Sequence, residues 1–200
     1  MISAILKRLF DLAASVIGLT LLLPVLAVLA LAVKLDSPGP VFYRGLRAGR
    51  FGKAFRIFKY RTMVVDAHKL GGPSSSADDP RITRVGGLLR RYKFDELPQL
   101  LNVLKGEMSL VGPRPEVVEE VLLYTAEEKG LLEVRPGITD WASIRFRNEG
   151  EILRGSSDPH AVYLEKIRPE KIRLGLEYVR RRSFMTDFKI ILKTLKAIVE

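Results

Sequence analysis

The chain has 200 residues, of which 33 are Lys or Arg and 23 are Asp or Glu, so its formal net charge is +10. A content of 47% hydrophobic residues excludes a disordered chain, and a mean hydropathy of +0.09 excludes a protein with many membrane spans. The sequence contains no cysteine, which excludes a disulfide scaffold, a thiolate zinc site and a cysteine nucleophile. The positive charge predicts an anionic partner: nucleic acid, anionic lipid or a phosphorylated substrate.

The first predicted element is a membrane helix. Leu12–Val33 is an uncharged run of 22 residues, and a straight helix of that length would reach about 33 Å, enough to cross a bilayer core. The run is long for a signal peptide, and a helix apolar on every side is hard to bury in a domain of this size. We therefore assign residues 1–36 to the membrane and residues 37–200 to one further domain.

Basic residues flank this run at both ends, with Lys7 and Arg8 before it and Lys34 after it. Positive charge favours the cytoplasmic side, so a single straight span would leave one cationic end on the wrong face. Pro24, near the middle of the run, removes a backbone donor and can break the helix. We predict a broken, re-entrant helix that enters one leaflet and returns, with a single span as the alternative.

The segment after the membrane helix predicts a small β-hairpin with a cationic face. The turn Ser37–Pro40 ends the helix, and Val41–Leu46 and Phe55–Met63 are the two predicted strands. Between positions 37 and 65 the sequence has no acidic residue and seven basic ones: Arg44, Arg47, Arg50, Lys53, Arg56, Lys59 and Arg61.

Three helical regions are predicted in the second half of the chain. Val117–Lys129 has the pattern of a surface helix, and Leu164–Arg182 is helical in two pieces broken at Pro169. Apolar residues recur at helical spacing from Phe184 to Val199, with lysines on another face. That pattern is typical of an amphipathic helix on an anionic membrane surface, and a helix packed on the protein core is the equal alternative.

Residues 90–116 contain the best candidates for chemistry. The leucines from Leu97 to Leu104 predict one apolar helix face, Gly106 suits the C-terminal end of that helix, and Pro98 is tolerated only in its first turn. Asp95 then lies at or near the N-cap. At this point Asp95 is either a structural cap or a functional carboxylate.

Three features favour a functional site. Asp95 is adjacent to Glu96, so one carboxylate can react while the other positions a metal or a proton. A helix N-terminus attracts phosphate through its free N–H groups and its dipole. Cations such as Arg90 precede the pair, and Arg114 follows it between two prolines that stiffen its backbone. This combination predicts phosphoryl chemistry on a lipid-linked substrate.

These motifs resemble those of the monotopic phosphoglycosyl transferases, the bacterial sugar transferase family. The resemblance rests on Lys7 and Arg8 before an apolar helix with a central proline, and on blocks that follow in family order: residues 58–63 (FKYRTM), 95–100 (DELPQL), 102–106 (NVLKG), 108–109 (MS), 112–115 (GPRP) and 134–139 (VRPGIT). It covers most of the chain, and DELPQL together with GPRP is highly specific.

The predicted fold class is α+β and mostly helical, with a re-entrant membrane helix, a small β-hairpin and amphipathic interfacial helices around a compact cytosolic catalytic domain. The resemblance implies transfer of a sugar 1-phosphate from a nucleotide-diphosphate sugar, usually a UDP-sugar, to polyprenyl (undecaprenyl) phosphate, with release of UMP. This is the first membrane step of glycoconjugate or exopolysaccharide synthesis. It implies a bacterial inner-membrane protein whose active site lies on the cytoplasmic face, in contact with anionic lipids.

The resemblance also implies roles for individual residues. Asp95 is the expected nucleophile, which forms a phosphosugar–aspartyl intermediate, and Glu96 completes the dyad. Mg²⁺ is the expected cofactor, with Asp95 as its ligand. The residues expected to bind substrate or phosphate are Arg114, Arg90, Lys59, Arg135 and Arg147.

The chain departs from the family pattern in two places. Leu23 stands where many members have serine before the membrane proline, so the helix break must be held in another way. Asp140, Ser143, Arg145 and Phe146 also differ, so the resemblance implies no particular sugar. Larger members add N-terminal transmembrane helices and another domain, and this chain is expected to begin at the catalytic unit.

Two other hypotheses remain open. One is a membrane-tethered basic adaptor without catalysis, although the sequence has no recognisable helix-turn-helix or RNA-binding signature that would favour a nucleic-acid partner. The other is an enzyme that binds donor and acceptor together and forms no covalent intermediate. The oligomeric state is open as well, with a homodimer as one alternative.

Overall fold

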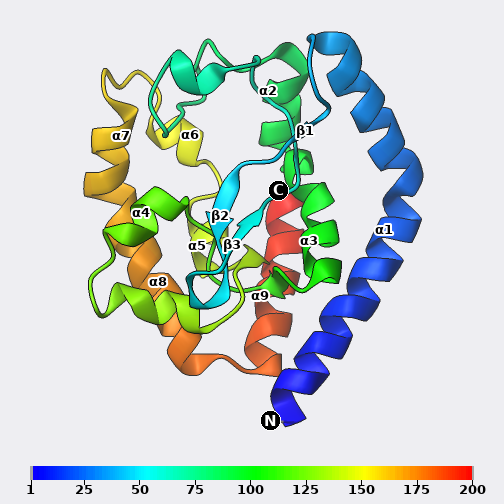
Figure 1. Ribbon diagram of the computed structural model, residues 1–200, viewed down its shortest axis with the longest axis vertical. Coiled ribbons are helices and arrows are strands. Elements are labelled where there is room, and N and C mark those ends of the chain that lie inside the picture. Colours follow the sequence, from blue (N-terminus) through cyan, green and yellow to red (C-terminus); the bar gives the residue numbers. More distant parts are fainter. Residues whose placement is uncertain (1, 200) are drawn as a thin grey trace.

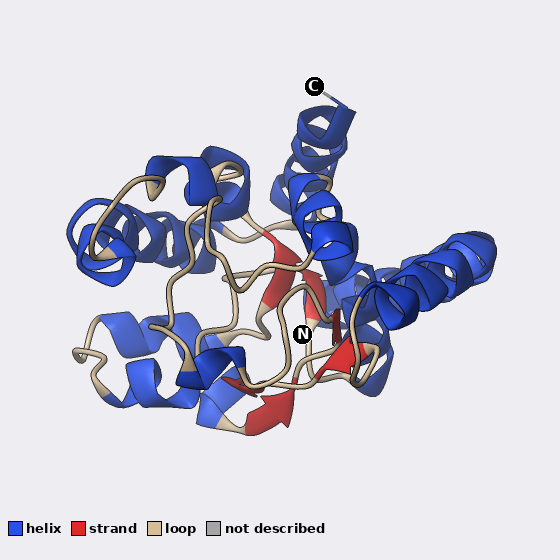
Figure 2. Ribbon diagram, turned by 90° about the horizontal axis from the view of Figure 1, so that it is seen from above, coloured by secondary structure: helices blue, strands red, loops and turns tan. Residues whose placement is uncertain are grey.

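The computed structural model describes residues 2–199, and the side chains of residues 4–197. The described chain is mostly helical, with short strands that pair two by two, which confirms the predicted α+β class (Figures 1 and 2). A long helix, α1 (Ile2–Asp36), leads into a globular part. The other helices are α2 (Arg84–Arg91), α3 (Leu100–Lys105), α4 (Val118–Leu122), α5 (Trp141–Arg145), α6 (Glu149–Ile152), α7 (Pro159–Val162), α8 (Arg168–Arg181) and α9 (Phe184–Val199).

The predicted hairpin forms as two short antiparallel ladders. Its strands are β1 (Phe42–Tyr43), β2 (Leu46–Ala48), β3 (Ala54–Arg56) and β4 (Lys59–Tyr60). β1 pairs with β4, and β2 pairs with β3. Phe55 and Ile57 are buried while Arg56 between them is exposed, so alternate residues face the core and the solvent here. The alternation does not continue to Tyr60, which is buried although it has the parity of Arg56. The second strand ends earlier than predicted, at Tyr60, and the side chain of Arg61, the next residue, donates to the carbonyls of Ser37 and Pro40.

Helix α1 continues through Pro24, which differs from the complete break that the sequence predicts. A single proline removes only one backbone donor, and a bend relieves its clash with the preceding turn. In Figure 1 the helix is bowed, with both ends close to the globular part, and in Figure 2 its middle projects away from that part. The segment Ala4–Asp36 is long and apolar enough to cross a membrane.

The first turns of α1 are attached to the globular part by polar contacts. Lys7 Nζ lies 2.6 Å from Asp187 Oδ2 on α9. Arg8 donates to the carbonyls of the last turn of α3, at 2.7 Å for Val103 O, where a cation also meets the negative end of the helix dipole. Asp11 is buried and accepts a hydrogen bond of 2.7 Å from Ser109 Oγ. Lys7 and Arg8, the basic residues before the apolar segment, therefore also attach α1 to the globular part.

The other end of α1 packs on the same globular part. Val33 is buried in a cluster with Tyr60 and Leu89. The Tyr60 hydroxyl donates to Leu26 O at 2.6 Å, just beyond the proline, so a tyrosine from the hairpin contacts the helix near its bend. Asp36 accepts from the Val85 N–H at the start of α2. The remaining apolar side chains of α1 are largely exposed, among them Ile5, Leu9, Ile17, Leu21, Val28 and Leu31.

Two predicted helices start or stop at other residues than expected. α4 ends at Leu122 because Thr125 and Glu128 form a reciprocal pair of side chain to N–H bonds, at 2.8 and 3.2 Å, which begins a new helical turn at Thr125. The helix predicted over Leu164–Arg182 begins earlier than expected, since α7 and a π-helical turn (Tyr163–Ile167) run directly into α8. Pro169 lies in the first turn of α8, where the sequence predicts the boundary between two pieces.

The alternative of a C-terminal helix packed on the core is confirmed for one face of α9, and contact of its other face with a membrane stays a prediction. One face of α9 is packed on the core through Ile190 and Asp187, which are buried. Its other apolar side chains are exposed: Phe184, Met185, Phe188, Leu192 and Leu195. Positions 198 and 199 of the predicted pattern lie outside the described side chains.

Candidate active site

The acidic pair lies in a tight turn between α2 and α3. Phe94–Gln99 forms a 3₁₀ helix that begins after Lys93, a residue in the left-handed conformation with φ 59°. Asp95 is therefore inside a helical turn, and the prediction that it caps α3 is wrong, since Pro98 lacks an N–H and the 3₁₀ turn precedes the α-helix. Asp95 and Glu96 are 7% and 9% exposed. Two adjacent buried carboxylates need nearby positive charge to be stable.

Glu96 receives that charge from two cations on other elements. Lys59 Nζ, from β4, lies 2.7 Å from Oε1, and Arg114 donates to both carboxylate oxygens at 2.6 and 3.2 Å. Burial alone would raise the pKa of Glu96, but the charges of Arg114 and Lys59 hold it well below its usual value. Glu96 is thus an ionised residue whose two oxygens are both occupied by cations.

Asp95 has a different environment. Its Oδ1 is buried and has no hydrogen-bond partner among the described residues. Burial raises the pKa of Asp95, and the positive charges of Lys59, Arg90 and Lys93 oppose that shift. A buried polar atom without a partner is uncommon in folded proteins. The pair is therefore divided: Glu96 holds the cations, and Asp95 keeps an oxygen available.

Arg114 reaches Glu96 because of the strand that precedes it. β5 (Ser109–Val111) pairs in parallel with β6 (Gly137–Thr139), and residues 112–115 (GPRP) follow directly. A Cβ on Gly112 would lie 2.4 Å from Arg135 O, so only glycine allows the two chains to approach this closely. The charge of Glu96 raises the pKa of Arg114, which keeps its guanidinium cationic.

The structure brings most of the predicted site residues together. Lys59, Arg90 and Arg114 all act on the acidic pair by contact or by charge. Arg90 is held by Thr62 Oγ1 at 2.9 Å and by Ser75 Oγ at 2.7 Å. Arg147 lines a cavity next to Glu96. Arg135 is directed elsewhere, with its Nε 2.9 Å from Gly106 O at the C-terminal end of α3.

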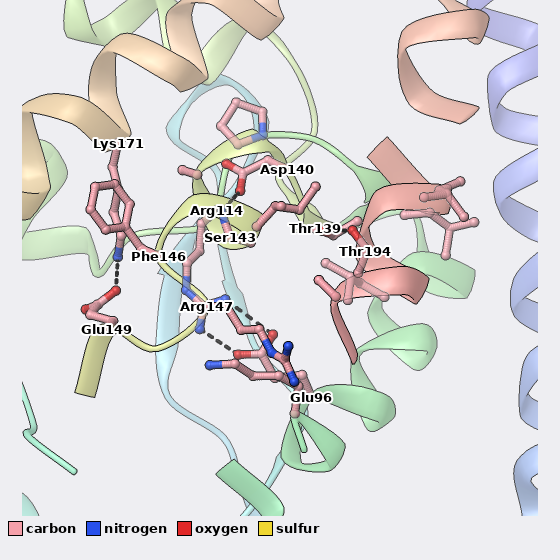
Figure 3. A pocket seen from close by; sticks show the side chains of 18 of the residues that line it. Glu96, Arg114, Thr139, Asp140, Ser143, Phe146, Arg147, Glu149, Lys171 and Thr194 are labelled. Atoms are coloured by element: carbon pink, nitrogen blue, oxygen red, sulfur yellow. Dashed lines mark hydrogen bonds and ion pairs between the residues drawn. The ribbon is translucent and has the colours of Figure 1, made fainter. Parts of the chain in front are cut away.

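A cavity of about 310 Å³ opens beside Glu96 and Arg114 (Figure 3). In Figure 3 the ion pair of Lys171 and Glu149 lies on one side of the cavity, and α9 with Thr194 lies on the opposite side. The cavity is also lined by Asp140, Ser143 and Phe146, all in the segment where the sequence departs from the family pattern. Its volume is in the range of small-ligand sites.

Sequence reasoning missed several residues of this cavity. Glu149 and Lys171 come from α6 and α8 and meet only in the fold, so no spacing signal could have found them. The contribution of α9, through residues such as Ile191 and Leu195, was also missed. Asp140 carries a signal in its N-cap position before α5, where it accepts from Ser143 N at 2.6 Å.

No cluster of three or more His, Cys, Asp or Glu suited to a metal occurs among residues 2–199. The free Oδ1 of Asp95 is still a suitable single ligand for Mg²⁺, which is commonly bound by one or two carboxylates together with substrate phosphates and water. Both oxygens of Glu96 are already engaged by cations, so Glu96 does not offer a second ligand.

The family model and the individual relatives that match this chain agree with one another. The family described as bacterial sugar transferase matches residues 2–200. The chain is 44% identical over 197 residues to the undecaprenyl-phosphate glucose phosphotransferase of Komagataeibacter xylinus, covering 95% of this chain and 35% of that protein. It is 41% identical over 197 residues to the UDP-glucose:undecaprenyl-phosphate glucose-1-phosphate transferase of Escherichia coli K12, covering 97% and 40%.

A shorter relative is matched over nearly its whole length. The exopolysaccharide production protein PSS of Rhizobium leguminosarum bv. phaseoli is 40% identical over 202 residues, which cover 96% of this chain and 94% of that protein. The chain thus spans well under half of the two larger relatives and almost all of the shorter one. The family match extends across the acidic pair, the GPRP segment and the cavity. The chain therefore belongs to the bacterial sugar transferase family.

Proposed function

We propose that the protein transfers a sugar 1-phosphate from a nucleotide-diphosphate sugar, most simply a UDP-sugar, to polyprenyl phosphate such as undecaprenyl phosphate. The observation that carries this proposal is the buried Asp95, whose Oδ1 has no partner among the described residues although cations surround it. Family membership and the names of the relatives, two of which act on undecaprenyl phosphate, support the same reaction.

The reaction proceeds in two displacements at one phosphorus atom. A carboxylate oxygen of Asp95 attacks the β-phosphorus of the donor, the bond from that phosphorus to the bridging oxygen breaks, and the electron pair leaves with the nucleoside monophosphate, UMP for a UDP-sugar. An oxygen of polyprenyl phosphate then attacks the phosphosugar–aspartyl intermediate, and the aspartyl–phosphorus bond breaks. Asp95 leaves as a carboxylate, ready for another donor.

The cations of the site make this attack by a carboxylate on a dianionic group feasible. Arg114 and Lys59 are fixed by Glu96, so their charges are in place before the donor binds, and phosphoryl transfer depends mainly on positioning and electrostatic stabilisation. Glu96 is in this proposal a positioning residue, because its two oxygens are engaged by those cations. Arg90 and Arg147 are further candidates for contact with the diphosphate.

Mg²⁺ is the proposed cofactor. When bound, it would neutralise charge on the diphosphate oxygens. Asp95 is the residue of this chain that would hold it. Substrate phosphates and water would complete the coordination.

We place the protein on the cytoplasmic face of the bacterial inner membrane, with α1 as a re-entrant helix in one leaflet. A straight span would carry its ends to opposite faces about 30 Å apart. Both ends of α1 instead contact the same globular part, through Lys7 and Arg8 at one end and Val33 and Asp36 at the other. The exposed apolar face of α1 supports contact with hydrocarbon.

One experiment tests the reaction directly. The purified protein is incubated with Mg²⁺ and a UDP-sugar labelled in the sugar, without acceptor. We expect label bound to the wild-type protein and nucleoside monophosphate released in equal amount, and neither with Asp95→Asn. Turnover that survives Asp95→Asn would reject Asp95 as the nucleophile. A screen of nucleotide sugars in the same assay identifies the donor.

A second experiment tests the topology. Single cysteines at positions 3 and 37 are labelled in intact cells and in inverted vesicles with a reagent that does not cross membranes. Because the native chain lacks cysteine, the background is low. The re-entrant arrangement requires both positions to react from the cytoplasmic side, and reaction from opposite sides contradicts it.

A further inference from the structure

The wall of the cavity that faces away from Lys171 and Glu149 is largely apolar, and its two hydroxyl groups, those of Thr139 and Thr194, bond to each other at 2.7 Å (Figure 3). We call it the α9 wall and define it by residues of α3, β5, β6 and α9: Leu100, Leu110, Ile138, Ile191 and Leu195. The charged lining residues Glu96, Arg114, Lys171 and Glu149 lie outside this wall (Figure 3). The cavity therefore joins a charged end to an apolar wall.

The chemistry of the α9 wall discriminates between the two substrates. A nucleotide sugar carries hydroxyl, carbonyl and phosphate groups, and burying such groups against hydrocarbon without hydrogen bonds is unfavourable. The hydrocarbon chain of a polyprenyl phosphate has no such groups and gains from losing contact with water. Its phosphate needs cations at one end of the site, and Lys93 and Arg114 are present there.

The α9 wall is continuous with the outer surface of the protein. Leu195 lines the cavity and is nevertheless 57% exposed. Phe188 precedes it by seven residues on α9, a spacing that places both side chains on one helix face, and Phe188 is exposed as well. This face offers an apolar path from the lipid surface into the cavity.

We propose that the α9 wall is the subsite for the first isoprene units of the acceptor, with Leu195 at its entrance. The inference rests on the proposed transfer to polyprenyl phosphate and adds where its hydrocarbon chain is held. The phosphate of the acceptor then points toward Arg114, and the polar end of the cavity is left for the donor.

The test separates the two displacements with a matched pair of variants. Leu195→Gln changes a residue of the α9 wall, and Leu192→Gln changes an equally exposed leucine of the same helix, 51% against 57%, that is not part of the cavity lining. The first displacement is followed as nucleoside monophosphate released without acceptor. The second is followed as product formed with undecaprenyl phosphate or geranyl phosphate in identical detergent micelles.

We expect Leu195→Gln to raise the KM for acceptor about tenfold relative to Leu192→Gln, as expected for loss of part of a buried leucine contact. The increase should be several times larger than any change in the first displacement. It should also persist with geranyl phosphate, because only the first isoprene units occupy the cavity.

Three outcomes would overturn the inference. A similar change in both variants would mean that α9 acts only by contacting the membrane. Slowing of the first displacement in Leu195→Gln would assign the α9 wall to the donor. An unchanged KM for acceptor would remove Leu195 from the subsite. Absence of the first displacement in the wild-type protein would instead reject the proposed function itself, so the two failures are distinguishable.

Discussion

Replacing Glu96 with glutamine removes the negative charge between Lys59 and Arg114 while preserving the size of the side chain. The side chains of Glu96 and Lys59 are 12% and 17% exposed, and that of Arg114 is 35% exposed. Removing one partner of a buried ion pair costs about 3–5 kcal/mol. Because Arg114 stays in contact with water, we expect the lower value, about 3 kcal/mol, which lowers the melting temperature of a chain this size by about 6–12 °C.

The measurement is thermal or denaturant unfolding of wild-type, Glu96→Gln and Glu151→Gln protein in one detergent. Glu151 pairs with Arg154 at 2.7 Å, the same distance as Glu96 with Lys59, but its pair is more than half exposed. Its loss should therefore destabilise the protein far less, because solvent screens the charges of an exposed pair. If Glu96→Gln destabilises no more than Glu151→Gln, the cluster is not held by buried charge and the argument fails.

The difference in stability between wild-type and Glu96→Gln protein should depend on pH. Burial would raise the pKa of Glu96, but Arg114 and Lys59 hold it well below the usual 4.5. A carboxyl group with a depressed pKa stabilises the fold fully above its unfolded value and loses that contribution as the pH falls through the folded value. The difference between wild-type and Glu96→Gln protein should therefore stay constant from pH 7 to about pH 5 and shrink only in stronger acid.

Three further predictions follow from other residues. Asp95→Asn should abolish release of nucleoside monophosphate yet raise the melting temperature at neutral pH. The gain in stability is expected because burial raises the pKa of Asp95, so that its ionised form opposes folding. This gain should shrink as the pH falls through the raised pKa. In the wild-type protein, the rate of the first displacement should fall on the acid side at a pH above the usual 3.8 of an aspartate, and a fall only below that value would contradict the burial argument. Gly86→Ala should destabilise the protein by about 1–3 kcal/mol, since its Cβ would lie 2.1 Å from Thr62 O, whereas Gly87→Ala, whose Cβ would meet its nearest atom at 3.9 Å, should be neutral or stabilising in the same unfolding assay.

The site residues that the sequence predicts correctly are those that lie in short contiguous motifs. Asp95 and Glu96 are adjacent, and Arg114 follows β5 in a segment stiffened by two prolines, so the local pattern already limits where these groups can point. Arg135 illustrates the limit of such reasoning. It belongs to a motif of the same family, yet its side chain caps α3 through Gly106 O, because the direction of a side chain depends on packing rather than on position in a motif.

The features that the sequence does not predict depend on contacts between distant segments. An amphipathic pattern indicates that α9 has an apolar face, but not that Ile190 is packed inward while Leu195 lines a cavity. The left-handed conformation of Lys93, which starts the 3₁₀ turn of the acidic pair, has no signature of its own, since residues other than glycine adopt it only where surrounding structure enforces it.

Lys7 connects the membrane helix to the backbone that carries Arg114. Its Nζ donates to Asp187 at 2.6 Å and to Val111 O at 3.2 Å. The Tyr178 hydroxyl lies within hydrogen-bond distance of the same two acceptors, 2.8 Å from Asp187 Oδ1 and 3.1 Å from Val111 O, and its single proton serves one of them at a time. Val111 is the last residue of β5, three positions before Arg114. Displacement of α1 would leave the buried Asp187 without its cation, which is strongly unfavourable. Lys7 thus ties the position of α1 to the strand that positions Arg114 on Glu96.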